Sequence, residues 1–186
     1  MISLDEARDL MEQEIETDAL RKHMLAVAAI MAAIADKRAV LEEEKENWLL
    51  AGLLHDLDYE RTQHEFEKHG LITAELLADK LPAACLEAIK AHNPRTGCEP
   101  RSEMARALIA ADALAGLIIP TALMMPSRKL ADVRVESLTK KFKDKSFART
   151  VSRDKIMSCE SLGLTRNELF TLALEALQPL SDELGI

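Results

Sequence analysis

Apolar residues recur at helical spacing along nearly the whole chain, and this pattern limits its possible folds more than any other feature. Val27, Ile30 and Ile34, for example, share one helix face because positions three, four and seven apart coincide there. No alternation of apolar and polar residues persists long enough to indicate a strand. Only 3% of the residues are aromatic, and the good helix formers Ala, Leu, Ile and Met supply most of the hydrophobic 48%. The sequence therefore predicts an all-α fold, a compact multi-helix bundle.

Turn and capping signals divide this pattern into helices. Pro82 suits a first helical turn, and the stretch "HNPRTG" from residue 92 is a strong stop. Thr165 and Glu168 have the spacing of a capping box. The 126–150 region is expected to contain short helices and loops. The predicted helices lie near 3–14, 18–36, 42–57, 65–80, 82–92, 102–124, 152–162 and 165–183.

The chain length predicts one domain over residues 1–186. Chains of 186 residues usually form a single domain with a sizeable core. The simplest arrangement is a helical core of about 18–125, followed by a basic helical extension of about 126–186 that packs onto it.

The charge is unevenly distributed. The net charge of −8 argues against non-specific binding of nucleic acid. Residues 128–155 nevertheless contain ten Lys or Arg against four Asp or Glu, a net +6, so the remainder carries −14. We call residues 128–155 the basic segment.

The cysteines and the apolar runs indicate the compartment. Cys85, Cys98 and Cys159 are odd in number and form no CxxC pair, which favours a reducing cytosol. The N-terminal stretch is acidic and unlike a signal peptide, and the longest apolar run, 107–119, is too short to cross a bilayer. We therefore expect a soluble, cytoplasmic protein with neither nucleic acid nor membrane as a partner.

Six ionisable side chains lie on otherwise apolar helix faces. One such histidine alone is more often a hydrogen-bonded core residue, and a buried Asp112 could be satisfied by an Arg or Lys. Together, however, the six come from five predicted helices and all face inward, which indicates one site, whereas His64 lies among polar residues and is expected at the surface. Gly52, in "ENWLLAGLLHDLDYE", would let another helix or a ligand come close to this site. The six residues are His23, His55, Asp56, His69, His92 and Asp112.

These ligand types indicate divalent metal. Nitrogen and oxygen ligands without thiolate favour manganese, iron, magnesium, cobalt or nickel over structural zinc, although zinc also accepts them. Neighbouring helical side chains diverge by about 100°, so His55 can hold one ion while Asp56 bridges to a second. His23 and Asp112 would complete the first site, and His69 and His92 the second. Two ions that share a water can activate it for a phosphoryl displacement.

The ordered set "H23…H55-D56…D112" resembles the HD-domain superfamily of metal-dependent phosphohydrolases. It is most similar to small bacterial HDIG-type members, although Leu57 and Asp58 stand where those have Ile-Gly. The segments "KHGLITAELL" and "AIKAHN" resemble the extra histidine segments of binuclear members, which include enzymes that split symmetrical dinucleoside tetraphosphates. The resemblance covers about residues 20–120. It implies that His23, His55, Asp56 and Asp112 are core metal ligands, with His69 and His92 as ligands of a second ion.

Several basic residues could bind the substrate's remaining negative charge. Arg128 and Lys129 follow the predicted Asp112 helix and could return toward its pocket end. Arg95, in the loop after His92, is a weaker candidate of the same kind. The lysines near 140–145 are expected to be a solvated face.

Two further residues are candidates for a catalytic role beside Asp56. Asp58 could assist proton transfer to a leaving group, or could serve the turn after the helix. Lys68 directly precedes His69 and could touch a phosphate, or could form an ion pair with Glu65.

The sequence thus predicts a hydrolase that uses water activated by one or two divalent ions. No Gly-rich phosphate loop and no serine or cysteine nucleophile motif is present, which leaves water as the nucleophile. The expected substrate is a small phosphorylated molecule, with a nucleotide suggested by the resemblance alone, and a homodimer is compatible with the sequence. Two alternatives stay open: a di-iron oxygenase of the same fold, and a non-catalytic helical adaptor braced by metal.

Overall fold

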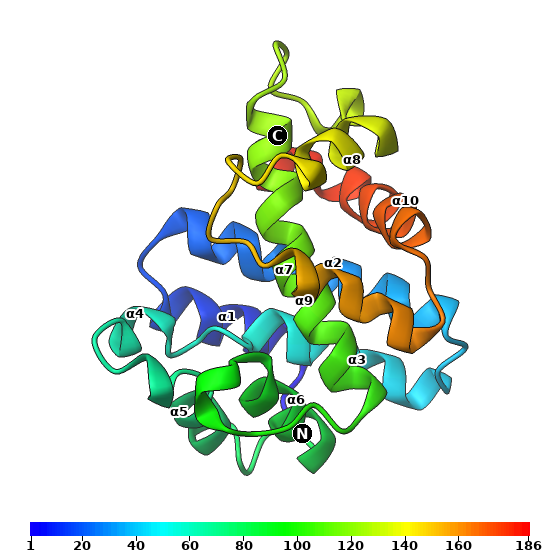
Figure 1. Ribbon diagram of the computed structural model, residues 1–186. Helices are drawn as coiled ribbons and strands as arrows, with labels where there is room; N and C mark the ends of the chain where they lie inside the picture. The colour runs from blue at the N-terminus through cyan, green and yellow to red at the C-terminus, as the bar shows by residue number, and fades with distance from the viewer.

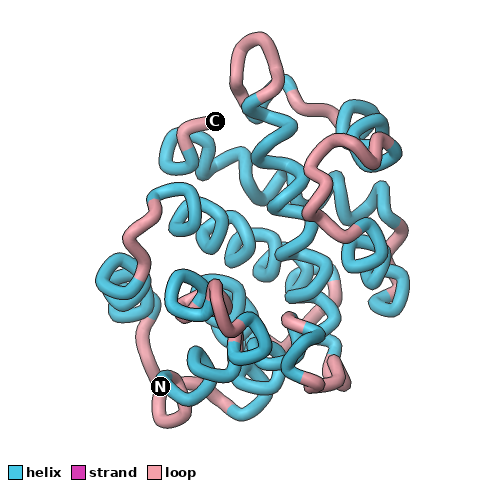
Figure 2. The backbone as a smooth tube through the Cα atoms, turned by 60° about the vertical axis from the view of Figure 1, so that its left-hand side comes forward, coloured by secondary structure: helices cyan, strands magenta, loops and turns pink.

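The computed structural model describes residues 1–186 and confirms the all-α prediction, since the chain contains helices and no strand (Figure 2). The α-helices are α1 (Leu4–Glu14), α2 (Asp18–Lys37), α3 (Glu42–Leu54), α4 (Tyr59–Thr62), α5 (Leu71–Leu76), α6 (Ala83–His92), α7 (Glu103–Leu123), α8 (Val135–Lys143), α9 (Arg153–Met157), α10 (Arg166–Leu177) and α11 (Ser181–Leu184). Short 3-10 helices are η1 (Phe66–Lys68), η2 (Pro94–Thr96), η3 (Leu130–Asp132), η4 (Ser158–Leu162) and η5 (Gln178–Leu180).

Helix α7 runs through the middle of the molecule and is packed on several sides (Figure 1). Helices α2, α3 and α6 contact it from the N-terminal part of the chain, and α8, α9 and α10 contact it from the C-terminal part. Buried side chains from both parts, such as Leu108, Ile156 and Phe170, belong to one hydrophobic cluster. The C-terminal extension therefore shares its core with the helices that carry the six ionisable residues.

The crossing of α2 and α3 is unusually close at Gly52. A Cβ atom there would lie 2.8 Å from the Cα and 3.0 Å from the backbone nitrogen of Ala28. No real Cβ contact is that short, so only glycine permits this approach. The close crossing brings the end of α3, with His55, against the second turn of α2, with His23, as the sequence predicted for this glycine.

The long apolar helix is a core helix. Helix α7 has 21 residues, so it is longer than the 107–119 run and passes the length and hydropathy test for a membrane span. The expectation that it is too short to span was therefore wrong. However, 61% of the most apolar 18-residue stretch of α7 is buried inside the protein, as in core helices of globular proteins.

Three predicted helices are shorter than expected. The 42–57 helix stops at Leu54, after which the backbone follows turns through Asp58. The 65–80 helix begins only at Leu71, because Gly70 is left-handed (φ 88°) and a Cβ there would lie 2.7 Å from the Ile89 oxygen. The 165–183 helix ends at Leu177, before a 3-10 turn that contains a proline.

Candidate metal centre

The structure brings the six predicted ligands together, but from different backbone positions than expected. His23 and Asp112 lie within α2 and α7, and His92 is the last residue of α6. His55 and Asp56 follow the last residue of α3, and His69 follows η1 in extended conformation, not on a helix face. The five-helix prediction was thus wrong in detail, although every side chain reaches the same place. The surface prediction for His64 is confirmed.

Asp56 lies at the centre of the cluster. Its Oδ1 is 3.2 Å from His55 Nε2, 3.2 Å from His69 Nε2 and 3.4 Å from His92 Nε2. Its Oδ2 faces His23 Nε2 at 3.8 Å. One carboxylate therefore faces four imidazoles, which is the arrangement that a bridging ligand requires.

His23 and Asp112 form the more open side of the cluster. His23 Nε2 lies 3.3 Å from Asp112 Oδ1, and these side chains are 18% and 23% exposed. Two sets of ligand atoms are close enough to hold an ion: one from His23, His55 and Asp112, and one from His55, Asp56 and His92. A small molecule can therefore reach the buried ligand set from the side of His23 and Asp112.

The hydrogen bonds of the buried histidines leave their Nε2 atoms as lone-pair donors. Nδ1 of His55 faces the Gly52 oxygen at 2.8 Å, so it must carry the proton. Nδ1 of His92 likewise donates to the Ile89 oxygen. Nδ1 of His69 donates to Asp58 Oδ1 at 2.7 Å. This is the orientation that ligating histidines adopt in metal sites.

The Nε2 atoms need a cation between them. His69 Nε2 and His92 Nε2 lie only 2.9 Å apart, and both also face Asp56. His55 Nε2 is buried and makes no hydrogen bond. Facing lone pairs and an unpaired buried nitrogen are costly in a protein interior unless a proton or a metal ion lies between them. The donor set therefore fits divalent metal.

The charges of the cluster hold both carboxylates ionised. Burial would raise the pKa of Asp56, but the adjacent His55, together with hydrogen bonds to other histidines, outweighs burial and lowers it well below its usual range. Burial likewise opposes ionisation of Asp112, yet His23 lowers the pKa of that carboxyl. Burial lowers the pKa of His92, which favours the neutral ring that can bind metal.

Asp58 holds His69 in place and does not face the cavity, which corrects its predicted role in proton transfer. It is completely buried, and its oxygens accept hydrogen bonds from His69 Nδ1 and from the backbone nitrogens of Gly70 and Thr73. It therefore orients the ring of His69 and caps the start of α5. The alternative prediction, that Asp58 serves as a cap or in the turn after the helix, is confirmed in part, because it caps the start of α5.

We expect Asp58→Asn to weaken metal binding without unfolding the protein. The N–H groups of the new amide would face the N–H groups whose hydrogen bonds Asp58 now accepts. His69 would therefore lose its fixed orientation. Loss of such a supporting contact typically costs about 10- to 100-fold in metal affinity. Competition with a chromogenic chelator measures this change, with the exposed Asp9→Asn as control. A folded variant with unchanged metal affinity would contradict this role.

A cavity of about 600 Å³ opens over the cluster. His23, Asp56, His69, His92 and Asp112 line one side of it. It is also lined by residues of α4, η1 and η2 and by residues of the 150–155 stretch. That size suits a small organic ligand.

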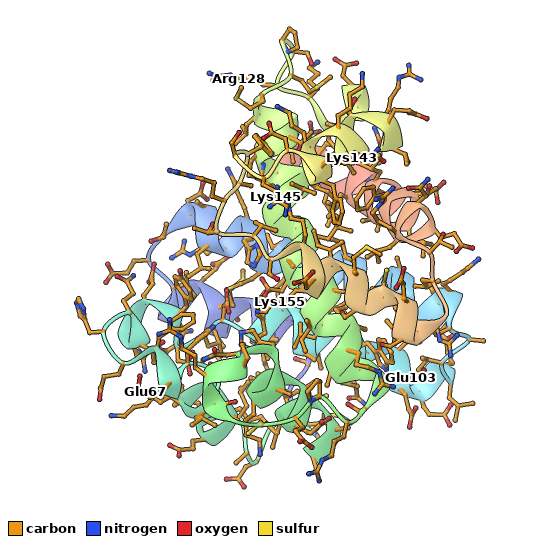
Figure 3. The ribbon with its side chains drawn as sticks, in the orientation of Figure 1. Glu67, Glu103, Arg128, Lys143, Lys145 and Lys155 are labelled. Carbon is orange, nitrogen blue, oxygen red and sulfur yellow. The ribbon has the colours of Figure 1, made fainter.

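Of the predicted basic residues, only Arg95 lines this cavity, where its guanidinium lies 5.5 Å from the centre of the Phe66 ring. Arg128 lies beyond the far end of α7 (Figure 3), and it lines a different cavity together with Lys129, which corrects their assignment as substrate ligands. They cannot return to the cavity because Asp112 lies in the middle of α7, several turns away. Lys68 is exposed and paired with Glu65, which corrects its catalytic role.

Sequence reasoning missed Lys155. It was counted only as one of the cations in the basic segment, yet its side chain lines the cavity. Its Nζ donates to the His92 oxygen at 3.0 Å and lies 3.7 Å from Asp112 Oδ2. The short helix α9 turns Lys155 toward α7, and no local signal distinguished it from the other lysines.

Comparison with known proteins identifies the family of this centre. A family model described as HD domain matches residues 20–117, just over half of the chain. All six ligand-type residues fall within that range, and Lys155 lies outside it. No curated protein and no solved structure matches the chain.

Proposed function

The chain belongs to the HD-domain family, most of whose members are metal-dependent phosphohydrolases, and on this premise we propose that it hydrolyses a phosphate ester or anhydride with two divalent ions. The observation that carries the proposal is the set of three Nε2 atoms around Asp56 Oδ1, all within 3.4 Å. A carboxylate in that position can bridge two ions, whereas a purely structural site needs only one closed shell of ligands.

Bound there, the ions would supply Lewis acidity to the phosphoryl oxygens and lower the pKa of the attacking water. His23, His55 and Asp112 would hold one ion, His69 and His92 the other, and Asp56 both. Asp58 and the carbonyls of Gly52 and Ile89 keep the histidine rings oriented.

Water is the nucleophile that the cavity supports. No cysteine lines the cavity, and burial raises the pKa of the Cys85 thiol to about 12, which keeps it protonated. Ser152 lines the cavity, but its hydroxyl accepts a hydrogen bond from the backbone N–H of Lys155 and so caps α9. Neither group has a neighbouring base to activate it.

A nucleotide is the substrate class that we favour. The cavity is large enough for one, and Tyr59 and Phe66 line it beside the metal ligands. Tyr59 is 38% exposed, so its ring can accept a stacked base, a contact worth about 1–3 kcal/mol. Opening of the cavity to solvent also argues for turnover and against a metal that only braces the core.

The proposal is tested by metal counting followed by a substrate screen. Protein purified without chelator or affinity-column metal is expected to contain about two ions per chain by mass spectrometry. It should release phosphate from nucleoside phosphates or other phosphate esters when manganese, iron, cobalt, nickel or magnesium is supplied. Iron-dependent oxygen uptake without phosphate release would instead establish an oxygenase. Failure to bind any of these metals would favour a non-catalytic adaptor in which the polar cluster is a hydrogen-bonded core.

A further inference from the structure

Two cationic side chains line the cavity, and they come from distant parts of the chain. Arg95 comes from η2, close to the matched HD-domain ligand His92. Lys155 comes from α9 in the C-terminal extension, outside the matched range. These two are the only Lys or Arg residues that line the cavity, so they are the side chains that can pair with the outer oxygens of a phosphate.

Lys155 is held over the cluster with spare hydrogen-bond donors. Its ammonium group has three N–H donors, and one is used by the His92 oxygen. Asp112 Oδ2, at 3.7 Å, is beyond hydrogen-bond distance, and the side chain is 30% exposed. At least one donor is therefore free, and because the side chain lines the cavity beside the metal ligands, this donor can reach an oxyanion bound there.

The stretch that carries Lys155 is held in place by the guanidinium group of the half-buried residue Arg153. Its guanidinium donates six hydrogen bonds to carbonyl oxygens, two in the last turn of α8 and four in the loop before α9, and none to a carboxylate. Such a cage fixes the conformation of a loop that has no regular structure of its own. The carbonyls belong to Lys141, Phe142, Asp144, Phe147, Ala148 and Val151.

This fixed loop forms part of the cavity wall. Thr150, Val151 and Ser152 line the cavity immediately before Lys155. Figure 3 shows Lys155 in front of the middle of α7, while Lys143 and Lys145 of the same basic segment lie further along toward α8. The C-terminal extension thus places Lys155 at the site, whereas Lys143 and Lys145 stay at the surface.

We propose that Lys155 is a substrate-binding residue that anchors a non-bridging oxygen of the phosphate at the metal cluster, with Arg153 as its positioning residue. This inference rests on the proposed function and extends it, because it assigns the second half of the site to the C-terminal extension. The ligand class is a phosphate ester or anhydride whose phosphorus carries at least one free oxyanion toward α9.

A rival interpretation is that Lys155 only neutralises Asp112. The two roles differ in what a loss of the ammonium group would change. A neutralising partner would alter the metal affinity of the site, whereas an anchor would alter the affinity for phosphate at unchanged metal content.

The test compares Lys155→Met with Lys155→Arg in the full-length, metal-loaded protein. Mass spectrometry gives the metal content, and titration calorimetry gives the affinity for inorganic phosphate. We expect Lys155→Met to retain its metal and to bind phosphate about 10- to 100-fold more weakly, because one charge-assisted hydrogen bond is lost. Lys155→Arg should recover most of the affinity. Lys145→Met removes the same charge from the exposed part of the basic segment and should change neither quantity.

Three other outcomes would overturn the inference. Loss of metal from Lys155→Met, with normal phosphate affinity in the remaining loaded fraction, would assign Lys155 to Asp112. Equal weakening by Lys145→Met would reduce the effect to overall charge, and a wild-type protein that binds no phosphate would exclude an anchor. Phosphate binding that depends on Lys155 in a protein without phosphatase activity would support the inference while contradicting the proposed function.

Discussion

Asp56→Ala is expected to remove the bound metal and to lower kcat/KM by at least about 10³-fold. Asp56 is the only residue whose carboxylate faces four of the histidines, so its loss takes a ligand from both ions at once. Metal-ion catalysis contributes several kcal/mol to the transition state, and 1.36 kcal/mol corresponds to a factor of ten. Mass spectrometry after dialysis and initial rates on the best substrate of the screen measure the two effects together.

A matched control separates this effect from general damage to the fold. Asp79 is exposed, and Asp79→Ala removes the same atoms without touching the cluster. That variant should keep its metal and its turnover, and both variants should keep their helical circular dichroism. Turnover that survives in Asp56→Ala would show that the mechanism proposed here is wrong. Metal that survives without turnover would limit Asp56 to a role in catalysis.

The ligand set could be predicted from the sequence because ionisable residues on apolar helix faces are rare and costly. Asp112, between the apolar residues of α7, could be recognised without knowledge of any contact. His69 was predicted for a less sound reason. The expected helix over 65–80 forms only from Leu71, since Gly70 is left-handed and lies against the Ile89 carbonyl, which belongs to another helix. Only the tertiary arrangement shows that constraint.

The supporting residues could not be predicted because their roles depend on distant partners. Asp58 was recognised as a possible cap, but its bond to His69, eleven residues away, follows from the turn after α3. Lys155 reaches the His92 carbonyl across 63 positions of sequence. In a segment with ten cations, charge alone does not show which one faces inward, and Arg128 and Lys129 were preferred only for their closeness to α7 in the chain.

Metal is expected to stabilise the protein strongly. A ligand that binds only the folded state adds about 4.1 kcal/mol to the free energy of unfolding at 1,000 times its Kd. For a chain of 186 residues, 1 kcal/mol corresponds to about 2–4 °C in Tm, so one saturated site should raise Tm by roughly 8–16 °C. Scanning calorimetry with added manganese and with chelator measures the difference. Asp56→Ala should show no such shift, and an equal shift in that variant would place the metal elsewhere.

This difference in Tm should widen as the pH rises from 6 to 9. In the metal-free protein, burial lowers the pKa of His69, but its hydrogen bonds to Asp56 and Asp58 outweigh burial and raise that pKa to about 9. A raised pKa contributes stability that is complete below the unfolded value of 6.5 and is lost as the pH climbs through 9. Metal binding follows the opposite course, because the ring must lose its proton to become a ligand. The metal-free protein therefore loses the contribution of His69 over the same range in which the metal binds more tightly. A difference that stays constant or narrows would mean that His69 does not bind the metal.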